Sequence, residues 1–173
     1  MNNDNILLVD ENDNVIGVSN KIDAHKKGLL HRAFSIFVFN DKKELLLQQR
    51  AVDKYHSAGL WTNTCCSHPG IDDEINIVAH RRLREEMGFD CELKEIFSFK
   101  YEVVLENRLM EHELDHVFIG YYDGQVCVND NEANHYKWAS MKFIKGDIIK
   151  RPDIYTAWFK ICCEKVFDYI NYN

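Results

Sequence analysis

The spacing of apolar residues along the chain predicts a set of β-strands. Short segments rich in valine, isoleucine, leucine and phenylalanine are separated by polar turns, which is typical of strands. The predicted strands are residues 5–10, 15–18, 33–40, 44–48, 62–64, 93–105, 110–122 and 136–139. The strands 33–40 and 44–48 flank the polar turn 41–43 and are expected to form a hairpin.

Residues 74–87 follow a helical period instead, and Gly88 is a helix stop signal. Further helices are expected near 141–150 and over 153–169, whereas 21–32 is a polar segment and 51–59 a polar loop. Strands that precede, separate and follow helices without regular alternation predict a mixed α/β sandwich, a sheet between helices with terminal extensions. Because no repeat or Pro/Gly-rich linker divides the chain, one domain over residues 1–173 is expected.

The helix 74–87 carries two charges in the stripe that should be buried. At about 100° per residue, Arg82 and Glu86 share one face with Ile75 and Ala79. Buried charges are costly unless they are paired or bound to something. They form either an internal ion pair four residues apart or part of a site for a metal and an anion. A thiol and an imidazole just upstream favour the site.

Composition limits the classes of partner. The net charge of −7 argues against general nucleic-acid binding, although a local basic cluster can still bind an anion. No apolar run approaches the ~20 residues of a membrane span, and the first residues lack the pattern of a signal peptide. The six cysteines contain no C-x-x-C pair. Reduced thiols in a cytoplasmic protein are therefore expected.

Three imidazoles and two carboxylates are candidate metal ligands: His25, His31, His68, Glu111 and Glu113. The two glutamates lie two apart on a predicted strand, so they project from one face and repel unless a cation or water separates them. This ligand set suits a divalent ion such as Zn²⁺ or Mn²⁺. Taken singly, each residue also fits an ordinary surface or hydrogen-bonded position.

Four basic residues are candidates for phosphate binding. Lys21, Arg50 and Lys54 lie in or beside predicted loops, and Arg82 lies on the helix. Arginine binds phosphate through its planar fork and lysine as a point charge. Loop lysines are often simply solvated, whereas the apolar helix face argues against that alternative for Arg82.

Two groups are candidates for proton transfer. Cys66 precedes His68 by two residues, and a thiol beside cations or a metal could exchange protons. A buried Glu113 could do the same from the opposite side. The alternative for Cys66 is a small buried apolar residue. Trp158 is expected on the apolar face of the last helix with Ile154, Ile161 and Tyr169.

At these residues the chain resembles the type I isopentenyl-diphosphate isomerases of the Nudix superfamily. The resemblance spans nearly the whole chain. It is carried by Lys21, His25, His31, Gln49, Arg50, Lys54, Trp61–Asn63, Cys66–Pro69, Arg81–Gly88, Tyr101, Glu111–Glu113 and Trp158. In the R-E-U-x-E-E-x-G core of the Nudix box (U is aliphatic), Arg82 replaces the first glutamate. Ser67 and Asp73 occupy the two leading positions of the box.

The resemblance implies a reversible allylic isomerisation of isopentenyl diphosphate to dimethylallyl diphosphate. It places Cys66 and Glu113 on opposite faces of the alkene, with Tyr101 near Glu113 and Trp158 near the developing cation. Cys66 rather than Cys65 has the spacing to His68 that the motif requires. It also implies one Mn²⁺, Zn²⁺ or Mg²⁺ at the His/Glu set, and a Mg²⁺ bridging the diphosphate and Glu86.

Two other classes remain as alternatives. A Nudix hydrolase of a nucleoside diphosphate derivative would use the same helix. Arg82 replaces one of the glutamates that bind Mg²⁺ in such an enzyme, so fewer carboxylates remain for the metal. A zinc-binding interaction module would need a Cys/His cluster at finger-like spacing, which the sequence lacks. The expected partner is a small-molecule diphosphate, with no nucleic acid and no membrane. The sequence leaves monomer and homodimer, and the native metal, undecided.

Overall fold

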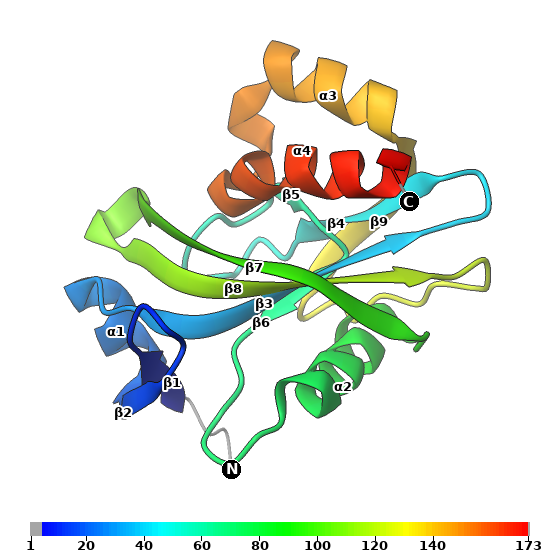
Figure 1. Ribbon diagram of the computed structural model, residues 1–173. Helices are drawn as coiled ribbons and strands as arrows, with labels where there is room; N and C mark the ends of the chain where they lie inside the picture. The colour runs from blue at the N-terminus through cyan, green and yellow to red at the C-terminus, as the bar shows by residue number, and fades with distance from the viewer. Residues whose placement is uncertain (1–4, 173) are drawn as a thin grey trace.

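A mixed β-sheet with helices on both faces organises the chain (Figure 1). The computed structural model describes residues 5–172. The strands are β1 (Asn5–Val9), β2 (Val15–Asn20), β3 (His31–Phe39), β4 (Glu44–Arg50), β5 (Trp61–Thr62), β6 (Cys65–Ser67), β7 (Leu93–Val104), β8 (Met110–Tyr121) and β9 (Ala133–Ser140). The helices are α1 (Lys21–Lys27), α2 (Ile75–Met87), α3 (Met141–Lys150) and α4 (Ala157–Tyr172), with short 3-10 turns at Glu106–Arg108 and Pro152–Ile154. The expected mixed α/β architecture is confirmed.

The central strand β3 has a parallel partner on one side. It runs parallel to β8, from His31 opposite Glu113 to Phe39 opposite Tyr121. It also pairs antiparallel with β6 and, at one residue, with β1. The expected hairpin of 33–40 with 44–48 forms only next to its turn. There Phe39 pairs with Leu45, which is the one paired position between β3 and β4 in the described part of the chain. A strand buried on both faces takes the central position of the sheet, so its edges pair with distant segments.

The alternation of β3 supplies two separate cores. Phe37 and Phe39 pack with α4 on one face, while Phe34, Ile36 and Val38 pack with α2 on the other. In Figure 1, α3 and α4 lie above the sheet and α2 lies below it. Each fully buried phenylalanine contributes about 1.5–3 kcal/mol relative to exposure. The sheet is therefore held from both sides, which makes it a rigid base for side chains at the strand ends.

Residues 21–27 form helix α1, where the polarity of 21–32 indicated no element. The Asn20 side chain accepts hydrogen bonds from the backbone N–H groups of Ile22 and Asp23. Gly28 ends the helix in the left-handed region, at φ 62°. The helix buries only a narrow face, with Ala24 and His25, so its apolar period is too short to recognise in the sequence.

Two further boundaries differ from the prediction. The expected strand at 62–64 is instead the pair β5 and β6, because the buried Asn63 amide donates to the carbonyls of Ile36 and Cys65. The last helix begins at Ala157, so Ile154 lies outside it. Its buried face includes Trp158 but not Ile161, which is 41% exposed. The predicted face was therefore wrong at both of these positions.

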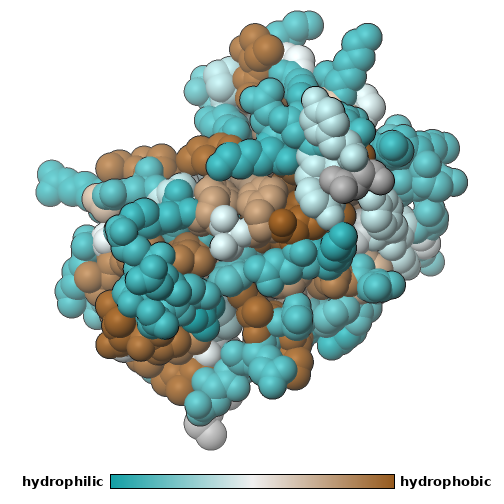
Figure 2. Space-filling model, viewed as in Figure 1, coloured by the Kyte–Doolittle hydropathy of each residue, from teal (hydrophilic) through white to brown (hydrophobic). Residues whose placement is uncertain are grey.

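The outer strand β2 leaves apolar side chains on the surface. Val15, Ile16 and Val18 are exposed there, and apolar atoms gather over β1 and β2 at the lower left of the space-filling view (Figure 2). Among residues 5–172, no helix is long and apolar enough to cross a lipid bilayer.

Candidate active site

Five candidate metal ligands from four parts of the chain converge at one end of the sheet. They are His25 on α1, His31 at the start of β3, His68 just after β6, and Glu111 and Glu113 on β8. One ligand atom from each lies within 4.8 Å of all the others. The parallel register places His31 directly opposite Glu113, which explains how residues far apart in sequence meet.

The hydrogen bonds of two imidazoles leave their Nε2 atoms facing the cluster. Nδ1 of His25 lies 2.6 Å from the Lys21 carbonyl and Nδ1 of His31 lies 2.7 Å from the Leu29 carbonyl. A carbonyl only accepts, so Nδ1 carries the hydrogen and Nε2 keeps its lone pair in each neutral ring. Metal-binding histidines are commonly oriented in this way.

The acceptors that face one another fit a cation. His25 Nε2 lies 3.1 Å from Glu111 Oε2, and His31 Nε2 lies 3.4 Å from Glu113 Oε1. His31 Nε2 is buried and finds no hydrogen-bond partner among the described residues. A divalent ion would satisfy these lone pairs, so the residues present fit the metal that the ligand set predicts.

Burial and mutual charge set the protonation of the cluster. Burial lowers the pKa of His68 to about 3, which keeps its ring neutral. Burial and the charge of Glu113 hold the pKa of Glu111 well above its usual range. Burial acts to raise the pKa of Glu113 too, but the nearby His31 and His68 rings, of which His68 is hydrogen-bonded to it, hold it well below that range. Glu113 is thus the ionised member of the pair.

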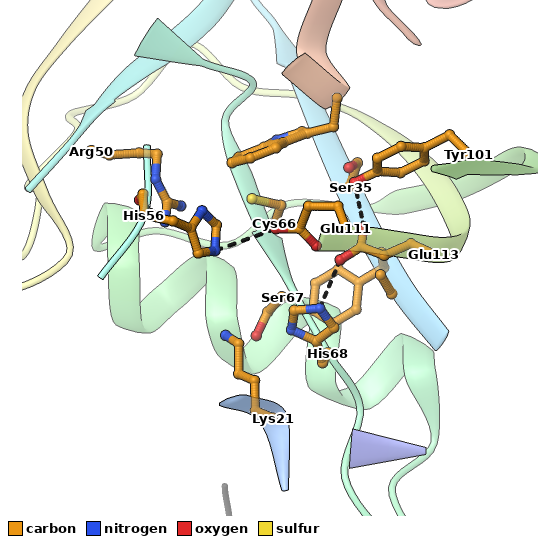
Figure 3. Close-up of a pocket in the computed structure, with 13 residues that line it drawn as sticks. Lys21, Ser35, Arg50, His56, Cys66, Ser67, His68, Tyr101, Glu111 and Glu113 are labelled. Carbon is orange, nitrogen blue, oxygen red and sulfur yellow. Dashed lines mark hydrogen bonds and ion pairs between the residues drawn. The ribbon is translucent and has the colours of Figure 1, made fainter. Parts of the chain in front are cut away.

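The proposed reacting groups line a cavity beside this cluster. Cys66, Tyr101 and Glu113 are in its wall (Figure 3). Trp158 belongs to the same wall. Tyr101 lies opposite Glu113 in the β7–β8 register and donates a hydrogen bond of 2.6 Å to its Oε2. Burial raises the pKa of the Cys66 thiol to about 12, although nearby Arg50 lowers it, so the group is a protonated thiol near neutral pH.

The two adjacent cysteines point to opposite faces of β6. Cys66 pairs with Ser35 and lines the cavity, whereas Cys65 pairs with Ile36 and is fully buried in the core against α2. Successive residues of a strand alternate in this way. Cys66 can therefore contact a ligand in the cavity, whereas Cys65 contributes to core packing.

The basic residues line a second cavity that adjoins the first. Its wall includes Lys21, Arg50, Lys54, Arg82 and Glu86, and Lys21, Arg50, Cys66 and Ser67 belong to both cavities. An anion held by these groups would therefore lie next to the thiol. Burial lowers the pKa of Lys21. The arrangement offers four cationic side chains to one ligand.

Arg82 also forms the internal ion pair that the sequence left open. Its guanidinium lies 2.8 Å from Glu86 Oε1, 2.6 Å from Glu85 Oε2 and 3.0 Å from Glu132 Oε1. Its Nε is buried and has no hydrogen-bond partner in the described part of the chain. The ion pairs therefore leave one donor of Arg82 without a partner within residues 5–172, and Arg82 lines the cavity together with the other basic residues.

Glu132 and His56 are among the cavity residues that the sequence analysis did not single out. Glu132 binds both Lys54, at 2.5 Å, and Arg82, and it follows β8 in a segment with no distinguishing pattern. His56 lies in the predicted loop 51–59, and its imidazole is 5% exposed. Burial lowers the pKa of His56 to about 2. No sequence pattern marks this histidine as buried.

The comparisons agree with this geometry. The NUDIX domain family matches residues 29–159. The chain is 55% identical over 155 residues to "Isopentenyl-diphosphate Delta-isomerase 2" of Photorhabdus laumondii, covering 90% of this chain and 88% of that protein. It is 51% identical over 163 residues to the protein of the same name in Aromatoleum aromaticum. That match covers 94% of this chain and 86% of the relative.

Solved structures share the fold at lower identity. A protein from Deinococcus radiodurans superposes with a TM-score of 0.71 at 16% identity, covering 85% of this chain and 90% of its own. The MutT protein of Methanosarcina mazei superposes with a TM-score of 0.68 at 23% identity. The match covers 83% of this chain and 96% of that protein. These structures show the fold, whereas the sequence relatives and the NUDIX domain match establish that the chain belongs to the type I isopentenyl-diphosphate Delta-isomerase family of the Nudix superfamily.

Proposed function

We propose that this protein interconverts isopentenyl diphosphate and dimethylallyl diphosphate. The observation that carries the proposal is that a thiol and a carboxylate, Cys66 and Glu113, line one cavity that opens onto a cluster of cationic side chains. Relatives about half identical over nearly the whole chain bear the name of this activity.

The reaction moves two protons and leaves the composition of the substrate unchanged. One group adds a proton to the terminal alkene carbon, and a tertiary carbocation-like state develops at the branched carbon. A second group removes a proton from the neighbouring methylene, which forms the new double bond. Cys66 and Glu113 are the proposed pair, and Tyr101 orients the carboxylate through its hydrogen bond.

Trp158 and the other buried residues of the cavity wall would protect the cation. The indole is 4% exposed and lines the cavity. The face of a tryptophan stabilises a desolvated cation by about 2 kcal/mol. Exclusion of water prevents capture of the cation as an alcohol.

Two divalent ions are proposed. His25, His31, His68, Glu111 and Glu113 would hold one, as Mn²⁺, Zn²⁺ or Mg²⁺, which would fix Glu113 and tune its acidity. Glu86 would share a Mg²⁺ with the diphosphate. Lys21, Arg50, Lys54 and Arg82 would contact the phosphate oxygens directly.

Hydrolysis of a nucleoside diphosphate derivative is the other activity considered. Arg82 stands where a hydrolase of this superfamily carries a glutamate, and its guanidinium neutralises the remaining carboxylates Glu85 and Glu86. The His/Glu cluster outside the Nudix helix has no role in that chemistry. These observations favour isomerisation.

A deuterium-exchange assay tests the proposal. Isopentenyl diphosphate incubated in D₂O with the metal-loaded protein should convert to dimethylallyl diphosphate and gain deuterium, as followed by NMR. Release of inorganic phosphate or a nucleotide monophosphate from a panel of nucleoside diphosphate derivatives, without any isomerisation, would instead establish the hydrolase.

Three broader expectations remain predictions. The chain is proposed to act as a single catalytic domain over residues 1–173, as a monomer or a homodimer. A cytoplasmic location is supported by the six cysteines, which are all free thiols, since reducing compartments favour that state.

A further inference from the structure

A fourth histidine contacts the candidate metal cluster from outside. His56 Nε2 lies 3.3 Å from Glu111 Oε1, while the other oxygen of that carboxylate, Oε2, faces His25. His56 is not among the residues whose ligand atoms lie within 4.8 Å of one another. It therefore contacts Glu111 through Oε1 (Figure 3), which is not the oxygen paired with His25.

The His56 ring is held in place by its other neighbours. Its Nδ1 lies 3.3 Å from the hydroxyl of Ser57. The ring meets Tyr55 edge-on at 4.4 Å and Trp158 edge-on at 5.9 Å between centroids. Arg50 donates a hydrogen bond of 3.3 Å to the His56 backbone carbonyl. A buried ring with contacts on this many sides has little freedom to turn away from Glu111.

The hydrogen-bonding capacity of these groups assigns the direction of the contact. The Ser57 hydroxyl can donate to Nδ1. A Glu111 carboxylate that ligates a metal is deprotonated and can only accept, so in the metal-bound protein the tautomer with hydrogen on Nε2 satisfies both neighbours. We propose that His56 is a positioning residue for the metal site, whose Nε2–H holds Glu111 with Oε2 turned toward the three ligand imidazoles. This inference rests on the proposed function in taking that cluster as the metal site.

Two amide substitutions test the proposal with little change in polarity. The glutamine amide in His56→Gln can place an N–H near the position of Nε2, whereas the shorter asparagine in His56→Asn reaches only the position of Nδ1. Partners that orient metal ligands change metal affinity by about 10–100-fold when removed. We expect Zn²⁺ binding to weaken by about that factor in His56→Asn and by clearly less in His56→Gln.

Zn²⁺ affinity is measured on the full chain without substrate, by competition with a chromophoric chelator. His135→Gln is the matched control, since His135 is exposed on β9, and its affinity should equal that of the wild type. Thermal melts of the metal-free proteins accompany each titration. If His56→Asn does not melt cooperatively, His56→Met replaces it, because methionine fills similar volume without a donor, and the same criteria apply.

Wild-type affinity in His56→Asn would overturn the proposal. Equal weakening in His56→Asn and His56→Gln would also overturn it, because the loss would then follow packing rather than the Nε2 donor. The readout is independent of turnover. A wild-type protein that bound Zn²⁺ but failed to isomerise isopentenyl diphosphate would refute the proposed function and leave this comparison intact.

Discussion

Replacing each of the two adjacent cysteines by alanine should separate catalysis from stability. Cys66 lines the cavity with Glu113, whereas Cys65 is fully buried against α2. If Cys66 supplies or accepts one of the two protons, Cys66→Ala should lower kcat on the order of 10²–10⁴-fold, the usual contribution of a positioned acid or base. That loss corresponds to about 3–5 kcal/mol of transition-state stabilisation, at about 1.36 kcal/mol per tenfold.

Cys65→Ala should behave in the opposite way. Removing a fully buried sulfur leaves a small cavity and costs about 1 kcal/mol of folding free energy. For a chain of this size, that is a decrease of about 2–4 °C in Tm. Its kcat should stay close to that of the wild type, because Cys65 points to the other face of β6.

The assay measures kcat, Tm and bound metal for both variants and the wild type. Cys66→Ala should keep its metal, since the thiol is not among the clustered ligand atoms. Loss of kcat in Cys65→Ala with a normal Cys66→Ala would show that the register of β6 against β3 is wrong by one residue. Wild-type kcat in both variants would refute proton transfer by a thiol.

Further substitutions address the metal, the anion site and the fold. Arg82→Ala should weaken binding of a pyrophosphate analogue by about 1–3 kcal/mol, as measured by calorimetry; unchanged affinity would assign Arg82 to its ion pairs alone. His68→Ala and Glu111→Gln should each lose most of the bound metal in elemental analysis, and full retention in both would remove the ligand assignment. Asn20→Ala removes the N-cap of α1 and should cost about 1 kcal/mol in denaturant unfolding; Asn20→Gly, which caps nearly as well, should cost only a few tenths.

The chemistry of the site could be proposed from residue types alone. Imidazoles at His25, His31 and His68 and two carboxylates on one strand face already indicate a divalent ion, because few other roles use that set. Arg82 and Glu86 stood out because a charge within an apolar helical stripe needs a partner. The long strands β7 and β8 could also be predicted from the sequence, because their composition and the turn between them are local features.

Contacts between distant segments were decided only by the tertiary structure. The pairing of β3 with β8 sets His31 opposite Glu113, and no local pattern encodes a parallel register. Helix α1 buries too few residues to show a helical period of apolar positions. The N-cap Asn20 and the C-terminal Gly28 were the sequence features that could have indicated it. His56 and Glu132 carry no pattern in the sequence, because their partners Glu111 and Arg82 are brought to them by the packing of the sheet. Local chemistry limits what a residue can do, whereas its partner is chosen by long-range strand pairing.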